Sequence, residues 1–129
     1  MLNNRGQALV LFVIVLPILI LMLILVIDVG KIIVLKNELT NISNIVLEYG
    51  IDNMYKDNIT IELEELVELN KKDIDEVKVN IENDKIYLYL SDKSDGVFAS
   101  FIDISIFNVK TSYVGYIDNQ EKRIEKMGD

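Results

Sequence analysis

The sequence contains no cysteine and no histidine. These absences exclude disulfide cross-links and the usual zinc sites, whose ligands are thiolates and imidazoles. They also exclude the Ser–His and Cys–His pairs that activate nucleophiles in many hydrolases. A chain without these groups is stabilised by packing or by partners. We expect a protein that acts by association, without a cofactor and without a metal.

Basic residues are scarce relative to acidic ones. The chain has 129 residues, 13 Lys and Arg against 21 Asp and Glu, and a net charge of −8. Residues 28–129 hold all the acidic residues and 12 of the basic ones, which leaves a net charge of −9. Nucleic-acid-binding proteins need a basic surface, so we expect no nucleic-acid partner, and nothing indicates a small-molecule substrate. Roughly 100 residues suffice for one small domain.

Proline occurs once, at Pro17, within a run that contains no charge. This run, Ala8 to Ile27, has the length of about 20 residues that crosses a bilayer as a helix. A cleaved secretory signal has a shorter apolar region followed by small residues, and a buried core helix has a polar face. The run therefore predicts a retained transmembrane helix. Pro17 predicts a kink in it, and local unwinding is the alternative.

The charges that flank the run predict its orientation. Residues 1–7 carry Arg5 and no acidic residue, whereas Lys31 and Lys36 are offset by neighbouring acids. Positive flanks stay on the cytoplasmic side of membranes. We expect a cytoplasmic N-terminal stub, a single-pass anchor in the cell membrane, and an extracytoplasmic α+β domain over residues 28–117.

An apolar stripe continues beyond the transmembrane run. Its residues recur in steps of three and four, which predicts one continuous helix from about Gln7 to Tyr49. Gly50 is expected to end this helix. We expect the stripe to pack on the domain's own strands, and a coiled coil with another chain is the alternative. The stripe consists of Ile32, Leu35, Leu39, Ile42, Val46 and Tyr49.

The middle of the chain predicts a second helix and a hairpin. Residues 52–58 are polar and turn-like, and residues 60–70 combine strand alternation with a helical spacing and a Glu and Leu content that favours a short helix. Two alternating segments between residues 77 and 92 flank Asn83-Asp84, a pair that tolerates positive φ. These features predict an antiparallel hairpin whose aliphatic face packs on the long helix.

The last third of the chain gives weaker signals. Residues 91–96 have the composition of a loop and resemble a calcium loop only incompletely, so a plain turn is expected. Residues 97–103 predict a short helix, and residues 104–117 predict a strand rich in β-branched and aromatic side chains. Residues 118–129 are charged and are expected to form a frayed polar tail.

Asp28, Gly30 and Lys31 form a motif at the expected membrane edge. Asp28 and Lys31 are three residues apart, so they can pair on one face of a helix. The alternative is an interfacial aspartate beside a lysine whose ammonium group reaches toward water. We take this motif, followed by Pro17, as the best candidate for a special role.

The segment from Arg5 to Gly30 reads RGQALVLFVIVLPILILMLILVIDVG. It resembles the N-terminal segment of TadE/TadG-like proteins of bacterial tight-adherence (Flp-type) pilus systems. That pattern has a basic residue and glycine before the apolar run, a Leu-Pro pair within it, and Asp-x-Gly followed by a basic residue after it. The corresponding residues are Arg5, Gly6, Gln7, Leu16, Pro17, Asp28, Gly30 and Lys31.

The resemblance implies a prepilin-like leader and a pilin-like fold. The leader would be cut after Gly6, leaving Gln7 as the new N-terminus. The fifth residue after the cut is Leu11, where cleaved pilins usually have a glutamate that pairs with a neighbour's amino terminus. An aliphatic residue at this place is common in TadG-like proteins. The chain therefore combines a TadG-like anchor with a short TadE-like body.

These observations predict a membrane-anchored minor pseudopilin or assembly factor of a Tad/Flp-type pilus. Its partners would be the lipid bilayer and other pilin-like subunits or inner-membrane platform proteins. One alternative is a membrane-tethered binding or regulatory module unrelated to pili. A membrane-bound hydrolase that uses two carboxylates, among residues 62–68 or 92–103, is a much weaker one.

Overall fold

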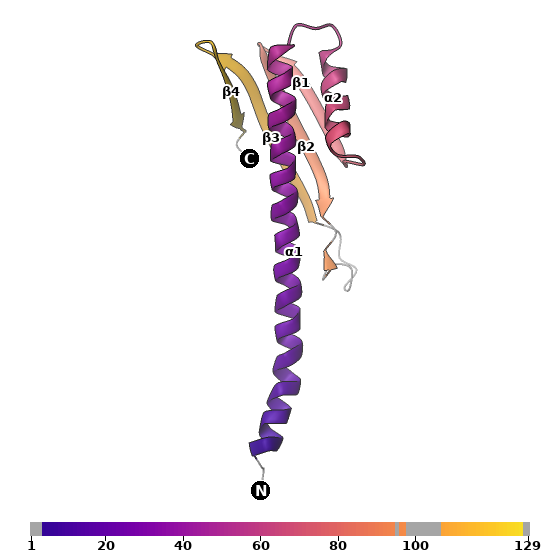
Figure 1. Cartoon of the computed structure of the whole chain (residues 1–129), viewed down its shortest axis with the longest axis vertical. Coiled ribbons are helices and arrows are strands. Elements are labelled where there is room, and N and C mark those ends of the chain that lie inside the picture. Colours follow the sequence, from indigo (N-terminus) through magenta and orange to yellow (C-terminus); the bar gives the residue numbers. More distant parts are fainter. Residues whose placement is uncertain (1–3, 95, 98–106, 128–129) are drawn as a thin grey trace.

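A computed structural model describes residues 4–94, 96–97 and 107–127 of the chain. Two helices and four strands occur in the order α1 (Asn4–Asp52), α2 (Ile59–Asn70), β1 (Glu76–Glu82), β2 (Lys85–Ser94), β3 (Phe107–Asp118) and β4 (Glu121–Lys126). The strands form one antiparallel sheet in the order β1-β2-β3-β4. α1 extends far beyond this sheet (Figure 1). The predicted α+β fold, with a long apolar helix packed on a small antiparallel sheet, is confirmed.

α1 is one uninterrupted helix of 49 residues. It begins and ends within three residues of the predicted bounds, and it continues in helical conformation through Pro17. The backbone is therefore not unwound at the proline, and a kink there stays a prediction.

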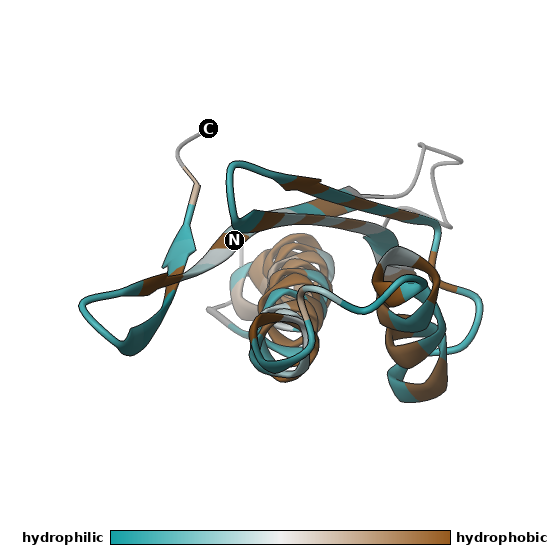
Figure 2. Ribbon diagram, turned by 90° about the horizontal axis from the view of Figure 1, so that it is seen from above, coloured by the Kyte–Doolittle hydropathy of each residue, from teal (hydrophilic) through white to brown (hydrophobic). Residues whose placement is uncertain are grey.

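Both helices cover the same face of the sheet. Figure 2 shows α1 and α2 side by side beneath it, with the β3–β4 hairpin at the edge of the sheet beside α1. The stripe of α1 packs on this face as predicted, although Tyr49 is 37% exposed, and Leu47 and Ile51 are buried in addition. The aliphatic face of the β1–β2 hairpin lies opposite, also as predicted. The core contains Leu35, Leu39, Ile42, Val46, Leu47, Ile51, Leu63, Val67, Ile86, Leu88 and Leu90.

Gly50 does not end α1, which corrects the prediction. It is buried within the helix, which ends two residues later at Asp52. A Cβ at Gly50 would lie 2.8 Å from Cδ1 of Ile86 and 3.2 Å from Cδ1 of Leu63. The glycine therefore serves close packing, because a Cβ at this position would force the ends of the Ile86 and Leu63 side chains to shift. The side chain of Asn53 donates a hydrogen bond to the Tyr49 carbonyl at the helix end (2.9 Å).

Two tight turns connect the outer strand pairs. Asn83 and Asp84 adopt φ values of 52° and 60°, which confirms the predicted β1–β2 hairpin. Asn119 and Gln120 adopt φ values of 49° and 66° and join β3 to β4. Consecutive positive φ values are typical of the two-residue turns that match strand twist. The prediction of a frayed tail is therefore wrong for residues 121–126. β4 has almost no apolar alternation because it is exposed on both faces, and only Ile124 packs against the core.

The remaining predictions for the domain have mixed outcomes. The turn after α1 and the short helix α2 are confirmed. Residues 91–94 were expected in a loop, but they extend β2 because residues 107–110 of β3 pair with them. The strand predicted over 104–117 is confirmed from Phe107 onward. The helix predicted over 97–103 lies outside the described residues, except for Val97.

Candidate site at the membrane edge

The first half of α1 exposes nearly all of its apolar side chains. Leu9, Leu19 and Val26 are 65%, 51% and 68% exposed. This part of α1 is long and apolar enough to cross a membrane. Its most apolar stretch of 18 residues contains no buried residue. A helix satisfies its own backbone hydrogen bonds, so such a surface is suited to lipid. In length and composition this half of the helix therefore has the properties of a membrane anchor.

The domain meets α1 where the apolar run ends. Asp28 is only 3% exposed, and its Oδ1 accepts a hydrogen bond from the backbone N–H of Val97 at 2.6 Å. This hydrogen bond joins α1 to the segment that follows β2. A special role of Asp28 stays a prediction. The pairing of Asp28 with Lys31 stays a prediction.

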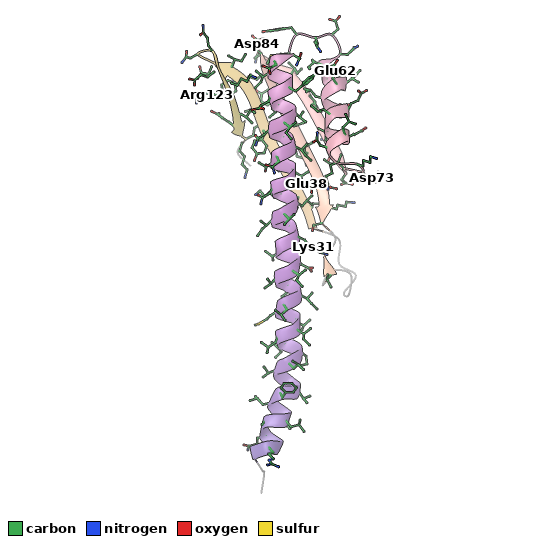
Figure 3. The ribbon with its side chains drawn as sticks, in the orientation of Figure 1. Lys31, Glu38, Glu62, Asp73, Asp84 and Arg123 are labelled. Atoms are coloured by element: carbon green, nitrogen blue, oxygen red, sulfur yellow. The ribbon has the colours of Figure 1, made fainter. Side chains whose placement is uncertain are left out.

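Gly30 and Lys31 line an open groove between α1 and the end of β2. We call it the edge groove, and its volume is about 490 Å³. Lys31 lies on the side of α1 that faces this end of β2, about two helical turns below Glu38 (Figure 3). A Cβ at Gly30 would meet nothing within 4 Å, so the groove is open at this position. The groove is lined by Ile27, Gly30, Lys31, Val34, Leu35, Glu38, Lys93 and Ser94.

An ion-pair cluster lies above the edge groove and joins three elements. The ammonium group of Lys71, just after α2, is 3.3 Å from Oε1 of Glu38 on α1 and 3.5 Å from Oδ2 of Asp92 on β2. The Lys71 and Asp92 side chains are 22% and 13% exposed, so solvent screens this pair only partly. The cluster holds α1, α2 and β2 together, and its Lys71 pairs with Glu38, the carboxylate among the described residues that line the groove.

The acidic residues considered for a hydrolase are otherwise engaged or exposed. Glu62 accepts a hydrogen bond from the Tyr49 hydroxyl (2.9 Å) and lies 3.9 Å from Lys56. The other three glutamates of α2 are exposed, and Asp92 belongs to the ion-pair cluster. Asp95 and Asp103 lie outside the described residues. Within the part of the chain that the structure describes, no group of three or more acidic residues is arranged to hold a metal ion.

The opposite face of the sheet carries tyrosines and lysines. The ammonium groups of Lys78 and Lys85 lie 5.5 Å and 4.9 Å from the ring centres of Tyr89 and Tyr116. The Tyr116 hydroxyl donates a hydrogen bond to Glu125 (2.9 Å), which raises the pKa of the tyrosine because the bond favours its protonated form. A hydrogen bond to Glu76 likewise raises the pKa of Lys78. Neither described helix covers this face (Figure 2).

The predicted processing residues lie at the start of α1. Gly6 and Gln7 are helical and exposed, and a Cβ at Gly6 would meet nothing within 4 Å. Leu11 is 63% exposed one turn further along the apolar surface. Cleavage between Gly6 and Gln7 stays a prediction.

The sequence was also compared with known proteins. The family described as TadE-like protein has a model that matches residues 6–44. No curated protein and no solved structure gives a match. The matched residues contain the exposed apolar half of α1, the membrane-edge motif and the beginning of the half that packs on the sheet. The resemblance to TadE-like proteins inferred from the motif is confirmed over residues 6–44, which we call the TadE-like segment.

Proposed function

We propose that the protein is a membrane-anchored minor pseudopilin or assembly factor of a Tad-type pilus. It acts by association of its helix and its domain and catalyses no reaction. One observation carries the proposal. The TadE-like segment coincides with the helix whose apolar surface is unburied over the length of a bilayer. A helix of this kind needs lipid or other helices around it.

The charges around the span support an orientation with the N-terminus in the cytoplasm. Arg5 precedes the span without an acidic neighbour, and the acidic domain follows it. The span then packs against other pilin-like helices or an inner-membrane platform protein. It contains few small residues, so close packing of the GxxxG type is not expected. The tyrosine-bearing face of the sheet is available to extracytoplasmic partners.

Leu11 supports the role of an assembly factor over that of a filament subunit. Such a subunit usually has a glutamate at this place, which pairs with the amino terminus of a neighbouring subunit. A glutamate at this depth is costly unless it is paired. With leucine there, the helix inserts without a charge and needs no partner for it. It also lacks the carboxylate that would align it with a neighbour's amino terminus.

The intact mass of the protein from its native membrane tests the processing step. Loss of Met1 to Gly6 would support a processed pseudopilin despite Leu11. A Gly6→Val variant, which blocks such a cut, serves as the control and should keep the full mass. A full-length wild-type chain would instead support an unprocessed, TadG-like assembly factor.

Piliation of a strain that lacks the gene tests the proposal as a whole. We expect few or no pili by electron microscopy, and recovery when the gene is restored. Normal piliation would overturn the proposal and favour a membrane-tethered binding or regulatory module unrelated to pili. Membrane fractions resistant to alkaline washing check the anchor separately.

A further inference from the structure

We propose that copies of this chain associate side by side through the edges of their sheets, with β4 of one copy pairing antiparallel to β1 of the next. The proposal rests on the proposed membrane anchoring, because a shared bilayer fixes the relative orientation of the copies. It names a partner, which is a second copy of this chain, and the two surfaces that meet.

The outer edge of β4 turns backbone groups away from the sheet. Among the described residues, no strand lies beyond β1 or β4. Alternate residues of an antiparallel ladder turn both of their backbone groups toward the same neighbour. The Met127 N–H donates to the Ser112 carbonyl (2.9 Å), one step beyond the last residue pair of the β3–β4 ladder. Counted back from there, the outward-facing residues of β4 are Lys122, Ile124 and Lys126.

The outer edge of β1 has a matching alternation. The turn at Asn83-Asp84 joins Glu82 to Lys85, which are partners in the β1–β2 ladder. Residues on either side of such a two-residue turn bond to each other through their backbones. The outward-facing residues of β1 are therefore Val77, Val79 and Ile81.

Both sets carry their side chains on the helix-covered face of the sheet. The three β1 residues and Ile124 pack against the core, and Nζ of Lys122 is 2.6 Å from Oδ1 of Asp52 on α1. Residues directly opposed in an antiparallel pair have their side chains on the same face, so the two edges match in pleat. With Ile124 opposite Val79 of the next copy, each outward-facing residue of one strand meets one of the other.

The strand directions suit copies that are anchored in one bilayer. Neighbouring strands alternate in direction, so β1 and β4 run in opposite directions. α1 runs along the strands (Figure 1). Copies with parallel anchors therefore bring β4 of one beside β1 of the next in antiparallel orientation. Pairing of β4 with β4 would instead point the two anchors in opposite directions, so the contact is head-to-tail.

The spacing of the helices allows their layer to continue across this contact. α2 packs on β1, and α1 packs mainly on β3 and β2. The two helices therefore lie about two strands apart, which is about 10 Å. β3 of one copy and β1 of the next would be separated by the same distance, so α2 of the next copy would lie beside α1 at the usual helix packing distance of about 8 to 10 Å. A sheet of four strands places neighbouring anchors about 19 Å apart, so the spans need not touch.

The two edges differ in charge, which favours the head-to-tail contact. Lysines on an edge strand usually oppose pairing, because like charges meet. β4 (EKRIEK) has more basic than acidic residues. α2, which covers β1, has four glutamates and no basic residue, and Glu64, Glu65 and Glu68 are exposed. The lysines of β4 thus approach an acidic helix of the next copy and not a second basic edge.

Cysteine cross-linking tests the contact in the full chain, which has no cysteine of its own. Asn80 and Arg123 of neighbouring copies oppose each other when Ile124 faces Val79. Within one copy they lie on opposite edge strands, about 14 Å apart across the sheet, whereas a disulfide needs Cα atoms within about 7 Å. We expect the Asn80→Cys and Arg123→Cys double variant, oxidised in liposomes, to give a ladder of dimers, trimers and larger species on a non-reducing gel.

The matched control combines Asn80→Cys with Lys110→Cys, since Lys110 is exposed on the inner strand β3. Equal cross-linking of the two double variants, or no species larger than a dimer, would overturn the proposal. Both outcomes would leave the anchoring proposal intact, which fails only if alkali extracts the chain from the liposomes. Unchanged far-UV circular dichroism shows that the variants are folded.

A charge reversal tests the electrostatic part of the contact. In the Asn80→Cys and Arg123→Cys background, Lys126→Glu should reduce cross-linking by about threefold, because it places an acidic residue beside the acidic helix of the next copy. Lys110→Glu makes the same change in charge away from the edge and should have little effect. An equal reduction by both variants would overturn the role of the basic edge.

Discussion

The two halves of α1 are built from the same apolar residue types, but only the second half buries them. Residues 9–27 are leucine, isoleucine and valine on nearly every side, and their side chains are exposed. Further along, apolar residues are confined to one stripe, and Leu39 and Val46 are fully buried against the sheet. The polar residues on the opposite side make the difference. A helix with a polar face folds onto its own domain, whereas one without such a face needs lipid or other helices.

The largest expected effect is on the free energy of unfolding of the domain, to which the two halves of α1 should contribute differently. Leu39→Ala should lower the free energy of unfolding by roughly 2 to 5 kcal/mol, because it opens a cavity in the core. Leu19→Ala, in the exposed half, should change it by less than about 0.5 kcal/mol. Unfolding of the full chain in micelles, followed by near-UV circular dichroism of the domain's tyrosines, measures both. Similar losses would show that the halves are not distinct.

The converse variant tests the membrane half. Leu19→Arg places a charge near the middle of the span, which costs about 2.5 to 3.5 kcal/mol of insertion free energy. We expect a large loss of the protein from alkali-washed membranes. Ile45→Arg is the control, since Ile45 is 48% exposed on the packed half. If both variants were retained equally, the apolar run would not be the anchor.

The junction between the halves should respond to Asp28→Ala. The change removes a part-buried hydrogen bond from the Val97 N–H, and a typical hydrogen bond contributes about 0.5 to 1.5 kcal/mol. We expect impaired pilus assembly with normal membrane insertion, and faster amide exchange at Val97. Asp28→Asn keeps an oxygen acceptor and should retain most of the protection. Normal piliation in Asp28→Ala would remove the special role of this residue.

The smallest effects come from the two glycines of α1 beyond the span, and they should differ in sign. Alanine is favoured over glycine in a helix by about 1 kcal/mol. Gly30→Ala should therefore be neutral or slightly stabilising, because nothing lies within 4 Å of the new Cβ. Gly50→Ala should be destabilising by about 1 kcal/mol net, since its Cβ would lie 2.8 Å from Cδ1 of Ile86. Thermal unfolding of both variants under one condition measures the contrast, and a change of the same sign in both would contradict it.

The periodicity of apolar residues and the turn residues predicted the elements whose structure depends on neighbouring residues in the chain. The spacing of the apolar stripe predicted α1, and Asn83-Asp84 between alternating segments predicted the β1–β2 hairpin. The end of β2 and the whole of β4 were missed, because their structure depends on pairing with β3. Gln120 is an uncommon residue at positive φ, so the second turn gave no recognisable signal.

The candidate site was predicted only in part for the same reason. The motif at Asp28, Gly30 and Lys31 was visible in the sequence. The partner of Asp28 lies 69 residues away in the chain, and Lys93 enters the edge groove from a segment that was expected to be a loop. Gly50 was read as a helix end because the sequence does not show that Ile86 lies against it.

The helical backbone of α1 continues without a break from its exposed apolar half into the domain, so a tilt of the first part also tilts the second. The part from Asp28 to Asp52 is about 37 Å long at 1.5 Å per residue. If the span tilts by about 20°, the average for transmembrane helices, the far end of the domain moves sideways by about 13 Å. Helices tilt when the bilayer thins. In the proposed membrane orientation, a local change in membrane thickness would therefore displace the domain sideways without any refolding.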